Sequence, residues 1–531
     1  MPRLPYKVIY NQDWTGLFIW TKDELIKPSD VDAMVDEIAD SSVDLLLINP
    51  NAQKVNYPST VWETEWENFA FTDPDRFTPA KSYQEALRQR HWVGQMRHLA
   101  LHGCDYLARA LARCRQRGIS PGVSVRMGDV HGYRGMPHAD SPRFSRFFKE
   151  HPEYHLPGNE RNGWSGLDFK HQAVRDHYLA LINELVRCYD IDVLELDFMR
   201  HPPFLDRADL VANARIITDF VTEVRRLMDA ADKPIALTAR VAATPAQSYE
   251  LGLDVRTWAQ KGLIAGITAA QWIVTGWEIR ADEYRRLVGE DVSVYVGADH
   301  YADRRRWLPE RRFSTRPEYI RGFAAAQLAN GADGCYLFNF FVARHSMSSS
   351  ESVGSEEPCF FTLREIHTLA DLRGKAKTYL LTGLTTSCES DLPCQIPREV
   401  PPNNAVSFEL LLAAETGDVI AELHVLVAGD YTPETIRAQL NEYPLGGPVR
   451  DLPEQLDQTQ SLPAAGAPFW GQIRRLIYAL PLAALRDGVN TVVVKYNRPL
   501  QHSWIIRRWS DLNDLPAVMV LGVECQVIPQ G

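Results

Sequence analysis

Two carboxylates lie on one face of a short apolar run, "IDVLELDFMRHPPF", at residues 191–204. In an extended strand alternate side chains point to opposite sides, so Glu195 and Asp197 share a face. The other face carries the apolar residues Leu194, Leu196 and Phe198. A buried carboxylate costs several kcal/mol unless a partner or a function retains it. Glu195 fits a structural ion pair as well as a functional role, whereas Asp197, nearer the carboxyl end of the run, is the stronger functional candidate.

Polar side chains also end most of the other β-rich runs. Arg126 has the inward parity in "SVRMGDVHG", and Asp129 follows it. Thr238 and Arg240 share a face of a later run, and Asp299 ends another. Further candidates for ligand binding at the same rim are Asn51, His131, Arg200, His201, Trp272, His300 and Asn339. Charged, amide and aromatic groups that converge on one rim suit a polyhydroxylated ligand.

The elements that would position these residues follow a strand–helix alternation. Eight β-rich runs occupy residues 7–11, 43–51, 120–129, 192–198, 234–241, 264–272, 292–299 and 334–341. Amphipathic stretches separate them, and the spacing of apolar residues predicts a helix over 173–189. Eight such units predict a (β/α)8 TIM barrel, whose chemistry lies at the carboxyl ends of its strands. A doubly wound sheet is the alternative, but no Gly-rich phosphate turn follows the first run.

The pattern changes after the Ser- and Glu-rich segment at 344–358. A short helical piece is expected at 362–373. Runs with a period of two residues then follow at 405–415, 419–429, 490–497 and 517–528. These predict an antiparallel β-sandwich. We therefore expect a catalytic barrel at 1–375 and an accessory sandwich domain at 376–531 that contributes no catalytic residue.

Composition limits the classes of partner. The 531-residue chain is 45% hydrophobic and 24% charged, and its net charge of −11 argues against nucleic acid and anionic membranes as partners. No signal-peptide-like segment and no run of roughly 18 apolar residues is seen, so a cytoplasmic protein is expected. Eight scattered cysteines suggest reduced thiols, and the spacing of Cys388 and Cys394 does not fit a zinc knuckle. Neither a cofactor nor a metal is expected, and a homo-oligomer is possible.

Three segments carry a resemblance to a known family. "LDFKHQAVRDHYLALINELVRCYDIDVLELDFMRHP", "SVRMGDVHG" and "GLDVRTWAQKGLIAGI" resemble the barrel of glycoside-hydrolase-like proteins related to the family-10-like glycosyl hydrolases. The resemblance covers residues 5–345. It implies a barrel and a carbohydrate-active role, and it places the catalytic aspartate of the family's strand motif on Asp197.

Glycoside hydrolysis requires two carboxyl groups on opposite sides of the scissile bond. Asp197 is the candidate nucleophile or base. Glu195 lies only about 6.5–7 Å from it along the strand, so both would approach a sugar from one side. Asp299, across the barrel, is the favoured general acid, with Asp129 and Glu195 as alternatives. An Asp197→Asn change is expected to abolish most turnover and to leave the melting temperature within a few degrees.

Three arginines bear on the charge of the ligand. Arg126, Arg200 and Arg240 either pair with the nearby carboxylates or bind an anionic group, since arginine binds carboxylate and sulfate in bidentate fashion. The second possibility predicts a glycoside that bears a uronic acid or a sulfate.

Two other functions stay open. A metal-dependent barrel lyase or isomerase would draw its ligands from His131, Glu195, Asp197 and His300. A non-catalytic carbohydrate-binding protein would bind glycans without turnover, and its binding would be unchanged in Asp197→Asn.

Overall fold

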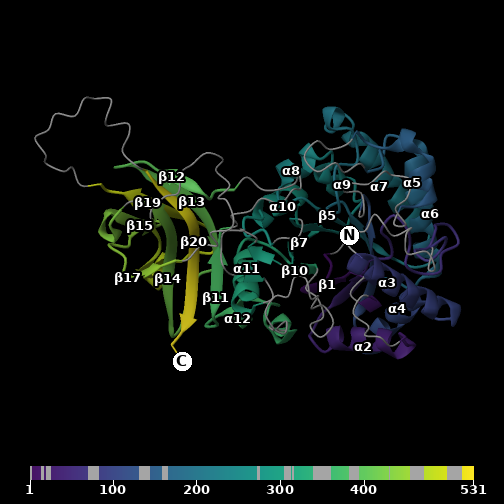
Figure 1. Cartoon of the computed structure of the whole chain (residues 1–531), viewed down its shortest axis with the longest axis horizontal. Coiled ribbons are helices and arrows are strands. Elements are labelled where there is room, and N and C mark those ends of the chain that lie inside the picture. The colour runs from purple at the N-terminus through teal and green to yellow at the C-terminus, as the bar shows by residue number, and fades with distance from the viewer. Residues whose placement is uncertain are drawn as a thin grey trace, which may run out of the picture.

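The computed structural model contains a barrel and a β-sandwich that lie side by side (Figure 1). The structure describes residues 3–13, 17–18, 25–69, 83–130, 144–157, 166–271, 275–299, 301–303, 312–313, 316–338, 360–381, 394–429, 431–454, 472–498 and 517–530. The C-terminal strands form the sandwich at the left of the view, and helix α11 (Pro317–Ala329) lies between the two parts.

Eight parallel strands close the barrel, which confirms the expected (β/α)8 fold. In chain order they are β1 (Val8–Gln12), β2 (Leu45–Ile48), β3 (Ser120–Arg126), β4 (Val193–Asp197), β5 (Ala236–Val241), β6 (Gly266–Ala269), β7 (Ser293–Ala298) and β10 (Gly334–Phe338). Each strand pairs with its neighbour in this order, and β10 pairs with β1 to complete the circle. Seven of the eight runs expected from the sequence contain one of these strands, and the first, 7–11, overlaps β1, which extends to Gln12.

Helices surround the barrel. They are α2 (Pro28–Ala39), α3 (Tyr83–Leu101), α4 (Tyr106–Arg117), α5 (Arg146–Glu150), α6 (Gln172–Cys188), α7 (Ala214–Asp229), α8 (Pro245–Glu250), α9 (Val255–Gln260), α10 (Ala281–Val288) and α11. The expected helix at 173–189 is α6, which buries the apolar face formed by Val174, Tyr178, Leu181 and Leu185. A short antiparallel pair, β8 (Tyr301–Asp303) and β9 (Arg312–Phe313), follows β7.

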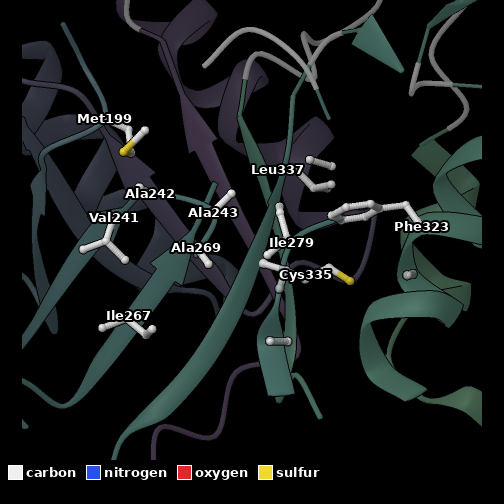
Figure 2. Close-up of a cluster of buried hydrophobic side chains, with 14 of the residues drawn as sticks. Met199, Val241, Ala242, Ala243, Ile267, Ala269, Ile279, Phe323, Cys335 and Leu337 are labelled. Carbon is white, nitrogen blue, oxygen red and sulfur yellow. The ribbon is translucent and has the colours of Figure 1, made fainter. Parts of the chain in front are cut away.

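Side-chain alternation divides the barrel into two cores. Leu194 and Leu196 belong to the large core between strands and helices, whereas Val193 belongs to a separate cluster inside the barrel. Outward side chains of β10 meet α11 in the same way, and Cys335 and Leu337 lie close to Phe323 (Figure 2). The inward face is therefore the one that carries Glu195 and Asp197, as parity predicted.

The second part is an antiparallel sandwich of two sheets, as expected. One sheet contains β11 (Lys377–Leu380), β12 (Arg398–Val400), β14 (Val419–Gly429), β17 (Arg450–Pro453), β18 (Gln472–Leu480) and β20 (Val518–Pro529). The other contains β13 (Ala405–Leu412), β15 (Ile436–Leu440), β16 (Tyr443–Pro444) and β19 (Gly488–Tyr496). The helical piece expected at 362–373 is a 3-10 turn (Phe360–Glu365) followed by α12 (Leu369–Leu372). The division at 375/376 stays a prediction.

Eight of the 13 residues of helix α11 are buried, because the barrel covers one face and strand β11 packs on another. Gly322 makes the closest approach: a Cβ there would overlap the Thr378 carbonyl oxygen. The sandwich is thus packed directly on the last barrel helix, and the contact between them depends on a residue without a side chain.

A Gly322→Ala change is expected to destabilise the protein by about 1–3 kcal/mol, because the backbones of α11 and β11 must move apart. The melting temperature should fall by several degrees. Gly166→Ala is the matched control, since a Cβ at Gly166 meets nothing closer than 3.8 Å. Equal melting temperatures for the two variants would show that α11 and β11 do not pack this tightly.

Candidate active site

Two layers of polar side chains fill the carboxyl end of the barrel. Sheet register makes Arg126, Asp197 and Arg240 Cα partners across β3, β4 and β5. One step lower, Ser124, Glu195 and Thr238 are partners across the same strands. All six side chains are buried. Because they alternate with core-facing residues, they point together into the barrel.

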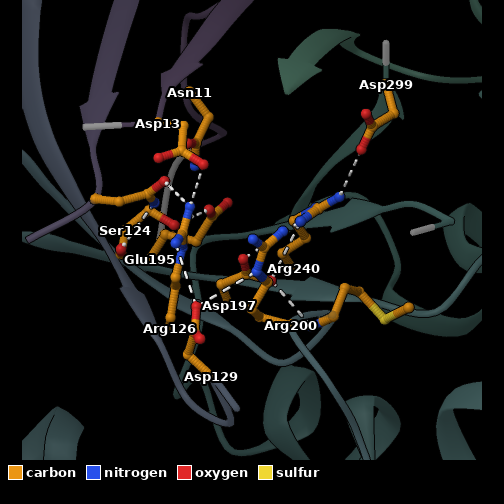
Figure 3. A network of polar contacts seen from close by, with 12 residues as sticks. Asn11, Asp13, Ser124, Arg126, Asp129, Glu195, Asp197, Arg200, Arg240 and Asp299 are labelled. Atoms are coloured by element: carbon orange, nitrogen blue, oxygen red, sulfur yellow. Dashed lines mark hydrogen bonds and ion pairs between the residues drawn. The ribbon is translucent and has the colours of Figure 1, made fainter. Parts of the chain in front are cut away.

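Arg240 joins the two carboxylates that the sequence favours for catalysis (Figure 3). Its Nη1 lies 3.3 Å from Asp197 Oδ2, and its Nη2 lies 3.9 Å from Asp299 Oδ2. Asp197 also accepts a hydrogen bond of 2.9 Å from the backbone N–H of Met199. The Thr275 hydroxyl donates to the Asp299 carbonyl and accepts from its N–H, which fixes the backbone beyond β7. The guanidinium thus holds carboxylates from two different strand ends near one another.

A second charged group lies on the side of β1 and β3. Arg126 donates to Asp13 at 2.8 Å, to Asn49 at 3.0 Å and to Asp129 at 3.2 Å. Arg200 Nε lies 3.5 Å from the same Asp129 carboxylate. Burial acts to lower the pKa of Arg126, but Asp13 and Asp129 outweigh it and the pKa is raised. Burial and the neighbouring Arg126 lower the pKa of Arg200.

The ring of Phe338, at the end of β10, lies near arginines of both charged groups. The Arg240 guanidinium lies 4.3 Å from the centre of its ring, and that of Arg200 lies 5.9 Å from it. Cations above an aromatic face are stabilised by the ring quadrupole. One ring therefore helps to fix the positions of two arginines.

Glu195 lies one layer deeper than Asp197. Its Oε1 accepts hydrogen bonds from the Ser124 hydroxyl at 2.8 Å and the Tyr336 hydroxyl at 2.7 Å. Asn11 donates in turn to Tyr336 Oη at 2.5 Å. Burial, together with the nearby charge of Asp197, raises the pKa of Glu195 to about 7.

No protein-family model matches the chain, and no curated protein sequence matches it. Solved structures resemble it in fold. The α-L-fucosidase isoenzyme 2 from Paenibacillus thiaminolyticus is 12% identical with a TM-score of 0.39, covering 68% of this chain and 49% of its own. The PgaB (BpsB) glycoside hydrolase domain from Bordetella bronchiseptica is 11% identical with a TM-score of 0.41, covering 68% and 99%. The noncanonic maltogenic α-amylase AmyB from Thermotoga neapolitana is 10% identical with a TM-score of 0.36, covering 90% and 99%.

Their names describe a fucosidase, a glycoside hydrolase domain and an α-amylase, and the chain spans about half the length of the fucosidase. The resemblance to family-10-like glycosyl hydrolases stays a prediction.

The structure brings together most of the candidate residues that it describes. They are Asp129, Glu195, Asp197 and Asp299 for catalysis, with Arg126, Arg200 and Arg240 around them. Asn51 uses its amide on the backbone N–H and carbonyl of Arg126, so its described contacts fasten the end of β3. His201 has a φ of 55° and its Nδ1 lies 3.4 Å from the Val130 N–H. His131, Trp272, His300 and Asn339 lie outside the described residues.

Four residues of the site were not singled out in the sequence. They are Asp13, Ser124, Tyr336 and Phe338. Each has the inward parity of its strand or strand end. Asp13 continues the alternation of Ile9 and Asn11, so parity applied past the end of β1 would have found it. Tyr336 lies within the run at 334–341, where nothing in the sequence marks its hydroxyl as part of a site.

The carboxyl groups of the site outnumber its arginines. Three arginines face five carboxyl groups, namely Asp13, Asp129, Glu195, Asp197 and Asp299. Each guanidinium contacts at least one carboxylate. The arginines therefore give no support to an anionic ligand.

The described part of the chain contains neither a metal-binding cluster nor a membrane-spanning helix. Its His, Cys, Asp and Glu residues include no group of three or more that could hold a metal ion. Because His131 and His300 lie outside that part, the metal-dependent alternative is not tested. Within the same residues, no helix combines the length and apolar character needed to cross a bilayer.

A buried carboxylate fastens the loop that follows β2 to helix α6. Glu184 accepts hydrogen bonds from Tyr57 at 2.8 Å, from Ser59 at 2.6 Å, and from both the N–H and the hydroxyl of Thr60 at 2.7 Å. Burial acts to raise the pKa of Glu184, but these hydrogen bonds outweigh it and the pKa is lowered. The loop carries Asn51, so Glu184 supports the rim of the site from outside.

Glu184→Gln is expected to lower the melting temperature at pH 7 by a few degrees, because the amide can accept fewer of these hydrogen bonds. A carboxyl group whose pKa is lowered on folding adds stability above its unfolded pKa and loses it as the pH falls through the folded pKa. The gap between wild type and variant should therefore close below pH 4.5. Glu223→Gln, at a side chain 50% exposed, is the control. A gap that does not change with pH would contradict the ionised contact.

Proposed function

We propose that the chain is a glycoside hydrolase in which Asp197 is the nucleophile or base and Asp299 is the general acid. The observation that carries the proposal is the bridge of Arg240 between these two carboxylates, which lie at the ends of β4 and β7, two strands that are not neighbours in the barrel. Hydrolysis of a glycosidic bond requires such a pair, with one group on each side of the sugar.

The surroundings of each carboxylate favour different roles. Asp197 accepts hydrogen bonds from the Met199 N–H and from the Arg240 guanidinium, and both donors suit a carboxylate that acts as nucleophile or base. Arg240 lies nearer to Asp197 Oδ2, at 3.3 Å, than to Asp299 Oδ2, at 3.9 Å, and we therefore assign the proton donor's role to Asp299. Asp129 contacts both Arg126 and Arg200, and this suits a charge-balancing role better than proton donation.

The same contacts favour a neutral glycoside as the substrate. An anionic group would have to compete with carboxylates that already face the arginines, and would meet their repulsion. A sugar hydroxyl both donates and accepts hydrogen bonds, so it can bind to either sign of charge. A uronate or sulfated glycoside is the less favoured class of substrate.

The experiment is a panel of neutral, uronate and sulfated aryl glycosides and oligosaccharides, with released sugar measured by chromatography. The Asp197→Asn protein, purified in parallel, controls for contaminating glycosidases. Hydrolysis of a neutral member by wild type alone is the expected result. Binding of glycans without release of any product would instead identify a carbohydrate-binding protein.

A further inference from the structure

Glu195 is set apart from the other carboxylates by its depth and by its partners. Its side chain is 1% exposed, and no guanidinium makes a hydrogen bond or ion pair with it among the described residues. Its two donors are neutral hydroxyls, those of Ser124 and Tyr336. Neutral donors compensate a buried charge less well than an ion pair does. The site thus contains one carboxyl group that its surroundings do not neutralise.

The geometry leaves one oxygen of Glu195 available for a proton. Both hydroxyls donate to Oε1, and within the described part of the chain no hydrogen bond reaches Oε2. Thr238 is the Cα partner of Glu195 on β5, and its Oγ1 is buried without a hydrogen bond among the described residues. Thr238 thus places a further neutral hydroxyl, and no cation, beside Glu195 on the neighbouring strand.

The charges around Glu195 also oppose its ionisation. Asp197 shares its face of β4, about 6.5–7 Å away along the strand. Among the described residues, the other titratable or charged groups inside the barrel and at its carboxyl end include Tyr6, Asp13, Arg126, Asp129, Arg200, Arg240, Tyr295, Asp299 and Tyr336. Arg126 contacts Asp13 and Asp129, and Arg240 contacts Asp197 and Asp299, so both positive charges are already engaged. Burial and Asp197 together raise the pKa of Glu195 to about 7.

We propose that Glu195 is a positioning residue that works in its neutral, protonated form and leaves Arg240 committed to Asp197 and Asp299. This rests on the proposed function of the site. A neutral Glu195 still accepts from Tyr336 and Ser124 and so fixes the floor beneath the reacting groups. An ionised Glu195 would compete with Asp197 for Arg240 and would loosen the bridge.

Glutamine has the shape of a protonated glutamate, so Glu195→Gln separates this role from acid–base catalysis. We expect kcat to fall no more than about tenfold at pH 6, where a catalytic carboxylate would lose roughly 10²–10⁴-fold. A loss as large as that in Asp197→Asn would overturn the proposal. If Asp197→Asn itself keeps full activity, the proposed function fails instead.

A stability titration tests the protonation without any substrate. A carboxyl group whose pKa is raised on folding stabilises the fold below its unfolded pKa, and this contribution is lost as the pH rises through the folded pKa. The melting temperature of wild type should therefore decline relative to Glu195→Gln between pH 4.5 and 7, and the difference should be constant above pH 7. A difference that is flat, or that changes in the opposite direction, contradicts a neutral Glu195.

Tyr336→Phe provides a second variant should Glu195→Gln fail to fold. Removing this donor takes away a hydrogen bond that favours the ionised carboxylate, so the pKa of Glu195 should rise further. The pH-dependent loss of stability should then extend to higher pH than in wild type. An unchanged pH dependence in this variant overturns the proposal.

Discussion

Asp197→Asn is expected to lower kcat by roughly 10³-fold or more, with a smaller change in KM. The amide has no negative charge with which to attack the anomeric carbon or to activate water. It also offers Arg240 a weaker partner, so the bridge to Asp299 is weakened at the same time. Steady-state kinetics on the best substrate of the panel measures the effect.

The fold should survive this change. Asparagine keeps the size of the side chain and an acceptor for the Met199 N–H, while Arg240 retains Asp299 and the ring of Phe338. We expect the melting temperature to fall by no more than about 5 °C. Asp219→Asn, at a side chain 61% exposed on α7, is the matched control and should change neither quantity. Near-normal turnover in Asp197→Asn would remove this residue from the mechanism.

Asp299→Ala is expected to lower hydrolysis of glycosides with poor leaving groups by roughly 10²–10⁴-fold, the usual contribution of a general acid. The aryl group of an activated glycoside leaves without protonation, so the hydrolysis of these substrates should fall far less. The comparison of kcat/KM between a nitrophenyl glycoside and an unactivated oligosaccharide measures the difference.

The Asp129→Ala variant is the control that separates proton donation by Asp299 from charge balance. Asp129 contacts Arg126 and Arg200, so its loss should affect good and poor leaving groups to the same extent. The two assignments would be exchanged if the loss of kcat/KM were independent of the leaving group in Asp299→Ala but depended on it in Asp129→Ala.

The barrel could be predicted because its signal is local. Each strand run alternates between a face that packs on helices and a face that points inward, and the helices between them repeat their apolar residues every three or four positions. The same alternation predicted the inward direction of Arg126 and Asp197 and the shared face of Thr238 and Arg240, and the strand register then places Arg126, Asp197 and Arg240 in one layer.

Strands of the sandwich were harder to find. β18 is not among the predicted runs; it carries Arg474 and Arg475, which pair with carboxylates of neighbouring segments. β11 begins with Lys377, which is buried and paired with Glu415. Charges that are neutralised by residues distant in the chain hide a strand from a hydrophobic pattern.

The pairing within the site could not be predicted either. Whether Arg240 binds a substrate anion or bridges Asp197 and Asp299 depends on distances between different strand ends, which a parity argument does not supply. The hydroxyl of Tyr336 is a similar case, because only the closed barrel brings β10 opposite Glu195.

The crystal structure of Asp197→Asn with a bound oligosaccharide substrate tests the central claim most directly. The inactive variant should hold an intact glycosidic bond at the carboxyl end of the barrel. The account predicts that the anomeric carbon lies beside the residue at 197 and that the Asp299 carboxyl group lies within hydrogen-bond distance of the glycosidic oxygen. An oligosaccharide bound elsewhere, or with its scissile bond flanked by other carboxyl groups, would contradict it.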